Sequence, residues 1–445
     1  MDRASSDGRL AAGTDPVDES LVSRSRELED VSFGAALDVD GAPRFQWTTP
    51  DGLEVVACGV AARFSAIGPD RFAHIRELAE RRFAALEYEG PTDSRPRAFG
   101  GLAFHADHEP EPPWRGFEAA TFVVPELQVT RTDDGTWLTV VEPSAQKTAE
   151  SLDYWTDRLD DLPAMRSSGA NPGIAGLRRT TTREAWAAGV EAALERIAGG
   201  DLEKVVLAQA LTADLEAPVD VAATLERLRR RYPNCYRFMI DHGEGSTFFG
   251  APPERLVSMR GRRVETEALA GSVPRGGTPE EDEAFAERLL ESEKLEREHG
   301  LVAETIRAQL EPLAGEVRVA DRTIRRLATI QHLRTPIEAT LEADRHVLEI
   351  VETLHPTPAV GGLPLEAAFE TIREIEPFDR GWYAAPVGWF DGDGDGEFAV
   401  ALRSGVAADD AVTLFAGNGI VADSDPEEEW DEVQLKFRPI LDELR

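Results

Sequence analysis

Short runs that alternate apolar and polar residues recur along this 445-residue chain, and amphipathic helical patterns separate them. Strands are predicted at 53–57, 137–141, 203–208, 247–250, 256–259, 398–403 and 412–415. Helices are predicted at 69–87, 183–198, 279–313, 346–351, 364–374 and 426–444. Period-2 runs indicate half-buried strands, and apolar residues three or four apart indicate helices that cover a sheet. We therefore expect an α+β fold with large antiparallel sheets and covering helices.

The ends of these patterns suggest three segments. Residues 1–30 are polar, and we expect them to be weakly ordered apart from a short helix around Leu21–Glu29. Residues 31–170 and 175–445 carry the strand and helix patterns. The Ser-, Gly-, Asn- and Pro-rich stretch 167–176 between them indicates a surface connection.

Composition restricts the partners of the chain. Its 83 acidic and 48 basic residues give a net charge of −35, spread along the whole sequence, and such a surface repels nucleic acid. No apolar run approaches the roughly 20 residues of a membrane helix, and no secretory signal is visible, so we expect a cytoplasmic protein without a membrane partner. Cys58 and Cys235 are expected to be buried thiols.

The balance of basic residues is unusual, with 44 arginines and only four lysines. Distributed acid with little lysine is typical of halophilic cytoplasm, where molar salt shortens the Debye length to about 3 Å. One of the four lysines, Lys204, opens a strand pattern directly after a helix that should stop at Gly199–Gly200. Arginine is too basic to give up a proton, whereas a buried lysine can act as a general base. Lys204 is therefore a candidate catalytic residue.

The last helix pattern is the clearest in the chain. Asp425 suits its N-cap and Pro426 its first turn. Glu429, Glu432 and Lys436 then fall on one stripe, and taken by itself such a stripe is more often a solvated acidic face than a site. The preceding Phe415–Val421 segment is expected to be a strand that enters a glycine-rich turn with free backbone amides for an anion.

Carboxylates from two helices could form a magnesium site. Glu298, in the long pattern after Pro279, could join Glu429 and Glu432, and Mg²⁺ prefers a few carboxylates together with water and a charged substrate. The acidic run Asp391–Glu397 resembles the start of a calcium-binding loop, but its twelfth position is Leu402 instead of a glutamate, so a hairpin turn is favoured.

Seven ordered segments together resemble the chorismate-utilising enzymes. They are Lys204–Ala208, Gly250–Leu256, Leu269–Ser272, Ser292–Lys294 with Glu298–His299, His355–Gly362, Glu376–Arg380 and Gly417–Glu432. This resemblance covers about residues 181–441, which makes 175–445 the expected chorismate-binding catalytic region and 31–170 the divergent half. It implies one large domain of two intertwined αβ halves with the active site between them.

Within that family, the resemblance is strongest to the isochorismate synthases. Ala359 stands where ammonia-using enzymes usually carry threonine, and Ala270 stands where aminodeoxychorismate synthases carry a nucleophilic lysine. Salicylate synthase activity is the nearest alternative, followed by the large subunit of an anthranilate or aminodeoxychorismate synthase. A catalytically silent binding protein is a further alternative, which the retained Lys204 and Glu254 disfavour. No glutaminase partner is expected, and a monomer is the default.

The resemblance also implies roles for individual residues. Lys204 would be the general base toward water and Glu254 the general acid toward the leaving ring hydroxyl. Mg²⁺ would be held by Glu298, Glu432 and Glu429, with chorismate as the substrate. Substrate contacts are expected from Gly271, Ser272, His332, Ala359, Arg403, Gly417, Gly419 and Lys436. Two residues depart from the family pattern: Gln209 replaces a common arginine, and Ser272 replaces threonine but keeps the hydroxyl.

Overall fold

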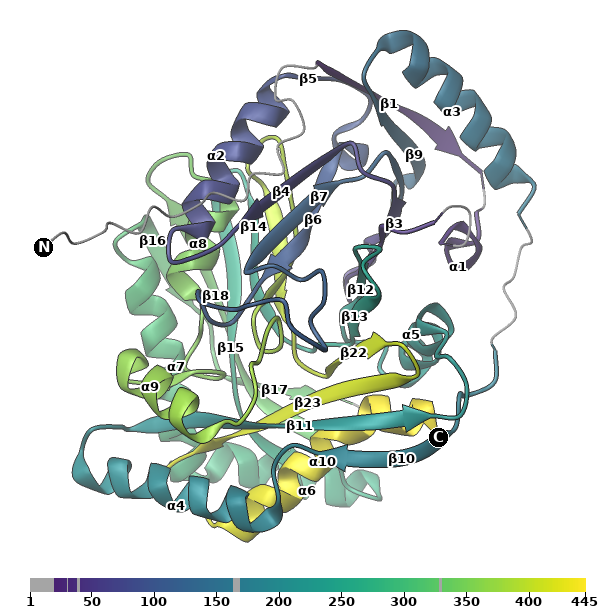
Figure 1. Cartoon of the computed structure of the whole chain (residues 1–445). Coiled ribbons are helices and arrows are strands. Elements are labelled where there is room, and N and C mark those ends of the chain that lie inside the picture. The colour runs from purple at the N-terminus through teal and green to yellow at the C-terminus, as the bar shows by residue number, and fades with distance from the viewer. Residues whose placement is uncertain (1–19, 30, 38–40, 163–168, 328–329) are drawn as a thin grey trace, which may run out of the picture.

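The fold, taken from a computed structural model, consists of two large sheets with helices around them (Figure 1). The structure describes residues 20–29, 31–37, 41–162, 169–327 and 330–445. Within these residues the strand pairs are antiparallel, except that β1 pairs with β5 in parallel. The predicted α+β class with large antiparallel sheets is confirmed.

The larger sheet has 13 strands among the described residues, in the order β10-β11-β23-β22-β13-β12-β2-β3-β8-β9-β1-β5, with β19 paired to β11. Its strands are β1 (Leu21–Leu28), β2 (Arg44–Thr48), β3 (Glu54–Cys58), β5 (Leu86–Glu89), β8 (Leu127–Thr132), β9 (Gly135–Glu142), β10 (Ile174–Arg179), β11 (Lys204–Leu215), β12 (Arg237–Asp241), β13 (Ser246–Gly250), β19 (Gly362–Leu363), β22 (Ser404–Ala408) and β23 (Ala411–Ile420). The β12–β2 pair joins strands from the two halves of the chain.

The smaller sheet has ten strands in the described part of the chain, in the order β16-β18-β15-β14-β21-β20-β6-β7-β4, with β17 paired to β18. They are β4 (Ala62–Ala66), β6 (Arg97–Leu102), β7 (Ala120–Val124), β14 (Arg255–Arg260), β15 (Arg263–Pro274), β16 (Ala314–Val319), β17 (Thr323–Arg326), β18 (Ile330–Leu341), β20 (Pro386–Asp391) and β21 (Gly396–Val400). Here the β20–β6 pair joins the two halves. Because both sheets contain strands from both halves, the halves are intertwined as expected.

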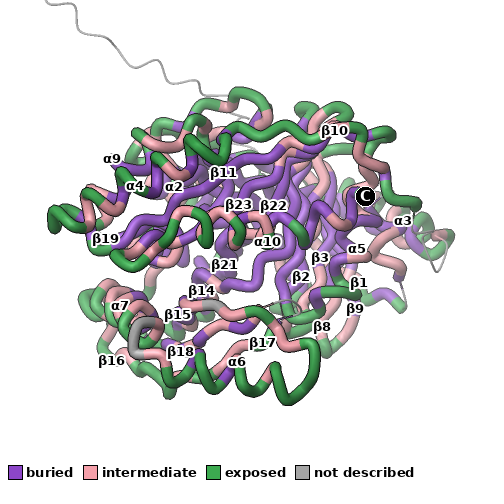
Figure 2. The backbone as a smooth tube through the Cα atoms, turned by 90° about the horizontal axis from the view of Figure 1, so that it is seen from below, coloured by how far each residue is buried: buried purple, intermediate pink, exposed green. Residues whose placement is uncertain are grey.

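Helices lie around the two sheets (Figure 1). They are α1 (Phe33–Ala36), α2 (Arg71–Ala84), α3 (Ala145–Asp160), α4 (Arg183–Gly199), α5 (Val221–Arg231), α6 (Pro279–Glu291), α7 (Glu293–Leu310), α8 (Val347–Leu354), α9 (Leu365–Ile375) and α10 (Pro426–Leu444), with a 3₁₀ turn η1 (Thr92–Ser94). In Figure 2 the buried residues concentrate in the strands, while the helices around them carry exposed faces. No helix in the described ranges is long and apolar enough to cross a membrane.

Local capping chemistry explains the helix ends that matter for the site. Thr182 accepts a hydrogen bond from the Ala185 amide at the start of α4, and Gly200 ends that helix with φ of 84°. Asp425 accepts from the Glu427 and Glu428 amides at the start of α10. Side-chain acceptors at the N-cap and a left-handed glycine after the last turn fix both boundaries, so these two helix predictions are confirmed.

Three local predictions were wrong. The short helix expected around Leu21–Glu29 is strand β1, because its residues pair with β9 and β5. The single helix expected over 279–313 is two helices, because Ser292 adopts an extended backbone and caps α7 through the Leu295 amide. The turn expected at Gly417–Gly419 is part of β23, which pairs with β11 through Ile420.

Two smaller expectations are confirmed. The Asp391–Glu397 run contains the tight turn between β20 and β21. Cys58 and Cys235 are buried thiols. The expected surface connection at 167–176 begins among residues 163–168, which lie outside the described residues, and from Ile174 the chain forms β10. Residues 1–19 of the N-terminal segment also lie outside them.

Candidate active site

Lys204 lies at the first position of β11, directly after the loop that follows α4. Its side chain is only 4% exposed, and its Nζ donates to Glu298 Oε1 at 2.7 Å. Glu298 comes from α7, which packs against β15. The structure therefore brings the predicted base, on a strand of the larger sheet, into direct contact with one predicted metal ligand, on a helix that packs against the smaller sheet.

Gly419 allows this contact to form. It lies in β23, where Val206 of β11 is its partner. A Cβ atom on Gly419 would lie 2.7 Å from Lys204 Cε and 3.7 Å from Glu298 Oε1. The first distance is too short for two carbon atoms, so the close approach requires glycine at this position.

A buried ion pair fixes the backbone of β11 beside Lys204. Arg380 and Glu376 are 1% and 2% exposed and lie 2.5 Å apart. Arg380 donates to the carbonyl of Val206 at 2.7 Å, and Glu376 accepts from the amide of Ala208 at 2.8 Å. Since a buried ion pair keeps its geometry only when its remaining hydrogen bonds are also made, these contacts hold the strand that carries the lysine in one place.

Glu254 lies in the short loop between β13 and β14 and is buried. The carbonyl of Glu254 accepts from the Val400 amide at 3.1 Å, and the amide of Ala251 donates to the carbonyl of Arg403 at 3.0 Å. The pKa of Glu254 is raised to about 8, chiefly by burial and then by the Glu267 charge, while the Arg325 and Lys204 charges oppose the rise. At neutral pH this carboxyl is protonated and can donate a proton.

The remaining predicted carboxylates lie beside the end of β23. Glu429 accepts from Asn418 Nδ2 and from Ser424 Oγ, each at 2.7 Å. Lys436 donates to the Gly417 carbonyl at 3.0 Å, contacts the Asn418 side chain, and pairs with Glu432 at 3.1 Å. Glu429 and Glu432 of α10 thus lie beside residues 417–419, whose other side faces Lys204 and Glu298.

The structure does not place Glu298, Glu429 and Glu432 together as one set of metal ligands. Among the described residues no group of three or more His, Cys, Asp or Glu side chains is close enough to hold a metal ion. Burial nevertheless raises the pKa of Glu429, and the neighbouring Glu432 charge raises it further. Carboxylates that are partly buried and repel each other are stabilised by a divalent cation, and their oxygen donors are those that Mg²⁺ prefers.

The predicted substrate contacts fall into two groups. His332 of β18 lies with Nδ1 3.2 Å from the Gly271 carbonyl, and desolvation together with the Arg403 and Lys436 charges lowers its pKa to about 3. Ser272 is the backbone partner of His332 in the β15–β18 pair. Gly271, Ser272 and His332 therefore lie together where β15 pairs with β18.

Arg403 lies between β21 and β22, and Ala359 lies between α8 and β19. Arg403 has a left-handed backbone, with φ of 48°, and its Nη1 lies 3.8 Å from Cys235 Sγ. Ala359 is half-buried in the loop after α8, where the Gly361 carbonyl accepts from the Val206 amide at 2.9 Å. Gln209 is buried in β11 and contacts Gln434 of α10 at 3.4 Å.

The sequence patterns did not identify several residues that shape the site. Asn418 and Ser424 orient Glu429, and Glu376 with Arg380 holds β11. Asn418 stands between two glycines in a strand whose other residues are apolar apart from Thr413, and a polar residue at that place was a usable signal. The Glu376–Arg380 spacing of four inside a non-helical segment gave no local indication of a contact with β11.

Comparison with known proteins agrees with this geometry. The chain matches the sequence profile of the chorismate binding enzymes over residues 10–445. It is 35% identical to isochorismate synthase MenF of Bacillus subtilis, with 95% of this chain and 93% of the relative covered. It is 36% identical to the salicylate biosynthesis isochorismate synthase of Pseudomonas aeruginosa, with 95% and 90% covered.

Solved structures share the fold. The menaquinone-specific isochorismate synthase MenF from Escherichia coli superposes with a TM-score of 0.82 at 28% identity, over 96% of this chain and 94% of that one. Anthranilate synthase component I from Streptococcus pneumoniae, at 21% identity, has the same fold with a TM-score of 0.75 over 88% and 93%. From its profile, its relatives and its fold, the chain belongs to the chorismate-binding enzymes.

Proposed function

We propose that this enzyme is an isochorismate synthase, which adds water to the ring of chorismate and removes the existing ring hydroxyl. The observation that carries the proposal is that the chain buries both an amine, Lys204, and a carboxyl, Glu254, that is protonated at neutral pH. The Lys204 charge opposes the rise in the pKa of Glu254. The names of the Bacillus and Pseudomonas relatives support the same activity.

In the proposed reaction Lys204 removes a proton and Glu254 supplies one. Lys204, after its ammonium group has given up a proton, takes a proton from a water molecule whose oxygen bonds to the ring carbon next to the one that bears the carboxylate. The ring double bonds shift, the carbon–oxygen bond of the existing hydroxyl breaks, and Glu254 gives its proton to the leaving oxygen. One water enters and one leaves, so chorismate and the product have the same composition.

Other residues of the site would hold the dianionic substrate. We assign one substrate carboxylate to Arg403 and the edge of β23 at Gly417 and Gly419, where pairing with β22 has already ended at Leu414. Lys436 adds positive charge at that edge. Gly271, Ser272, His332 and Ala359 would contact the ring and side chain of the substrate, and the neutral His332 imidazole can accept or donate a hydrogen bond.

Mg²⁺ is the cation that we propose for the carboxylates of Glu298, Glu429 and Glu432, although the structure does not bring these three side chains together as one set of ligands. These three carboxylates would hold it, with water completing the coordination, and when bound it would neutralise the ring carboxylate of the substrate. The raised pKa of Glu429 supports this assignment, because a cation there would relieve the repulsion from Glu432.

We also propose a setting for the enzyme. The net charge of −35 with four lysines supports a halophilic cytoplasm, where salt screens the repulsion between acidic groups. We expect a monomer that needs no glutaminase subunit, because the proposed nucleophile is water. The menaquinone-specific relative from Escherichia coli supports a role in menaquinone synthesis.

Product analysis tests the proposed activity. Purified protein is incubated with chorismate and Mg²⁺ in high-salt buffer, with and without ammonium, and the products are separated by chromatography. We expect isochorismate alone, unchanged by ammonium and lost when a chelator removes the metal. Salicylate would support the nearest alternative, and anthranilate would support an ammonia-dependent synthase. If the folded protein formed no product, the catalytically silent binding protein would be the favoured alternative.

A further inference from the structure

Backbone hydrogen bonds hold the loop that carries Glu254, residues 251–254, on two sides. The Tyr236 amide donates to the Pro252 carbonyl at 2.9 Å, and the Val400 amide donates to the Glu254 carbonyl at 3.1 Å. All four residues of the loop are buried. Because a buried backbone group needs a hydrogen-bond partner, these two bonds restrict the path of the loop.

The phenol of Tyr236 holds the residue that follows Glu254 in the chain. Its oxygen accepts a hydrogen bond from Arg255 Nε at 2.8 Å, and its hydroxyl donates to Glu397 Oε1 at 2.7 Å. Tyr236 is 1% exposed, and Glu397 of β21 is also buried. A guanidinium only donates and a carboxylate only accepts, so the phenol is the link that satisfies both groups.

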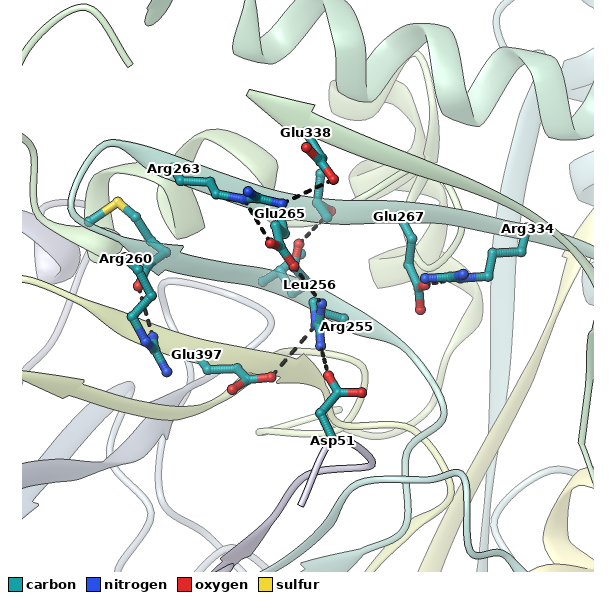
Figure 3. A network of polar contacts seen from close by, with 12 residues as sticks. Asp51, Arg255, Leu256, Arg260, Arg263, Glu265, Glu267, Arg334, Glu338 and Glu397 are labelled. Carbon is teal, nitrogen blue, oxygen red and sulfur yellow. Dashed lines mark hydrogen bonds and ion pairs between the residues drawn. The ribbon is translucent and has the colours of Figure 1, made fainter. Parts of the chain in front are cut away.

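Arg255, the first residue of β14, has further partners on three other parts of the fold. Its guanidinium lies 3.6 Å from Glu397, 3.3 Å from Glu265 of β15 and 2.5 Å from Asp51 in the turn between β2 and β3. Figure 3 shows Arg255 between Asp51 and Glu397. A planar guanidinium presents its donors in a fixed fork, so contacts on several sides hold the Arg255 side chain in one place.

We propose that Tyr236 and Arg255 are positioning residues for Glu254, and that they hold its loop from both sides so that the carboxyl stays in one place away from water. The inference rests on the proposed function of Glu254 as the general acid. Such an acid must lie within hydrogen-bond reach of the atom that receives its proton. Tyr236 reaches the chain before Glu254 through its amide and the chain after it through its hydroxyl.

Loss of the phenol oxygen should move the loop. In Tyr236→Phe, Arg255 Nε and Glu397 Oε1 lose the group between them, and they are 3.6 Å apart, too far for a direct hydrogen bond. A buried donor and a buried acceptor without partners are costly. Arg255 can reach Glu397 only by moving toward it, and the neighbouring Glu254 then moves as well.

The test compares full-length wild type with Tyr236→Phe by two measurements. An infrared pH titration without substrate follows the C=O stretching band of the protonated Glu254 carboxyl, identified by its absence in Glu254→Gln. Conversion of chorismate gives kcat and KM. Tyr88→Phe is the matched control, because it also removes a hydrogen-bonded phenol oxygen, 2.6 Å from the Pro91 carbonyl, but on β5, at the far end of the larger sheet from β10 and β11.

We expect the midpoint of the band to fall by about one pH unit or more in Tyr236→Phe, because a displaced loop admits water to a carboxyl that burial keeps protonated. The kcat value should fall by about 10-fold to 100-fold, since a misplaced reacting group can cost about 10²-fold. KM should change little, because the loop positions a proton donor. Tyr88→Phe should leave all three unchanged, and an unchanged midpoint and kcat in folded Tyr236→Phe would overturn the inference.

Arg255→Lys is a second variant that tests the same inference if Tyr236→Phe does not fold. It keeps the positive charge, but one ammonium cannot reproduce the fork of contacts, so the midpoint and kcat should fall as in Tyr236→Phe. Arg263→Lys is its control, because Arg263 also pairs with Glu265, at 2.9 Å, but from β15. Wild-type behaviour of Arg255→Lys would overturn the role of Arg255.

The titration needs no turnover, so it separates this inference from the proposed function. If wild type formed no isochorismate, the proposed function would fail, while a lower midpoint in Tyr236→Phe would still support the hold of Tyr236 on Glu254. If the midpoint fell in an active protein but kcat kept its wild-type value, the position of the loop would not matter for proton transfer. That result would overturn the positioning role.

Discussion

Replacement of Lys204 by alanine is expected to lower kcat by about 10³-fold or more while the protein stays folded. A positioned general base raises the rate on the order of 10²–10⁴-fold. Among the described contacts of Glu298 the only lysine is Lys204, so no second lysine there can replace it as the base. The loss should appear in kcat, because the amine acts on water instead of binding substrate. Product formation measured by chromatography gives kcat, and circular dichroism reports the fold.

Two further variants separate the base from the ion pair. Lys204→Arg can keep a cation beside Glu298, but arginine does not give up a proton at working pH, so this variant should be as inactive as the alanine variant. Lys147→Ala removes an exposed lysine of α3 and should leave turnover unchanged. If Lys204→Arg were active, the lysine would have only an electrostatic role, and wild-type turnover by Lys204→Ala would contradict the mechanism.

Glu254→Gln is expected to lose turnover by a similar factor and to gain stability at alkaline pH. The pKa of Glu254 is about 8 in the folded protein and near its ordinary value of 4.5 in the unfolded chain. The folded state therefore holds this proton more tightly, so the stabilisation is fully present below pH 4.5 and is lost as the pH rises through 8. The total loss is on the order of a few kcal/mol, and glutamine, which does not ionise, avoids it.

Thermal unfolding at pH 6 and pH 9 in the same salt measures this difference. The melting temperature of wild type should fall between the two values by more than that of Glu254→Gln. Glu80→Gln alters an exposed carboxyl of α2 and should follow the wild-type curve. Parallel pH dependence of wild type and Glu254→Gln would mean that Glu254 is not a buried acid with a raised pKa.

Local sequence patterns predicted those elements whose boundaries depend on neighbouring residues. The start of α10 follows from Asp425 and Pro426, and the start of β11 follows from Gly200 and the alternation after it. The glycines at 417 and 419 misled the prediction, because glycine in a loop pattern indicates a turn. They lie in a strand, where their lack of a side chain leaves room for Lys204 and for the backbone of β11.

The candidate site could also be predicted only in part, because some of its contacts join residues far apart in the sequence. Residue type and resemblance pointed to Lys204, Glu254 and the three carboxylates, and the structure brings Lys204 against Glu298. The contact of Glu376 with the Ala208 amide spans 168 residues, and that of Arg334 with Glu267 spans 67. Only the packing of the sheets determines such long-range pairs, so no local pattern could predict them.

The origin of the new hydroxyl tests the central claim most directly. Chorismate is converted in water enriched in ¹⁸O, and the product is analysed by mass spectrometry after a single conversion. Attack by a water activated at Lys204 predicts one ¹⁸O atom in each isochorismate molecule, located in its ring hydroxyl. A product that keeps only the oxygen atoms of chorismate would show that the hydroxyl migrates within the substrate, and would contradict water activation by Lys204.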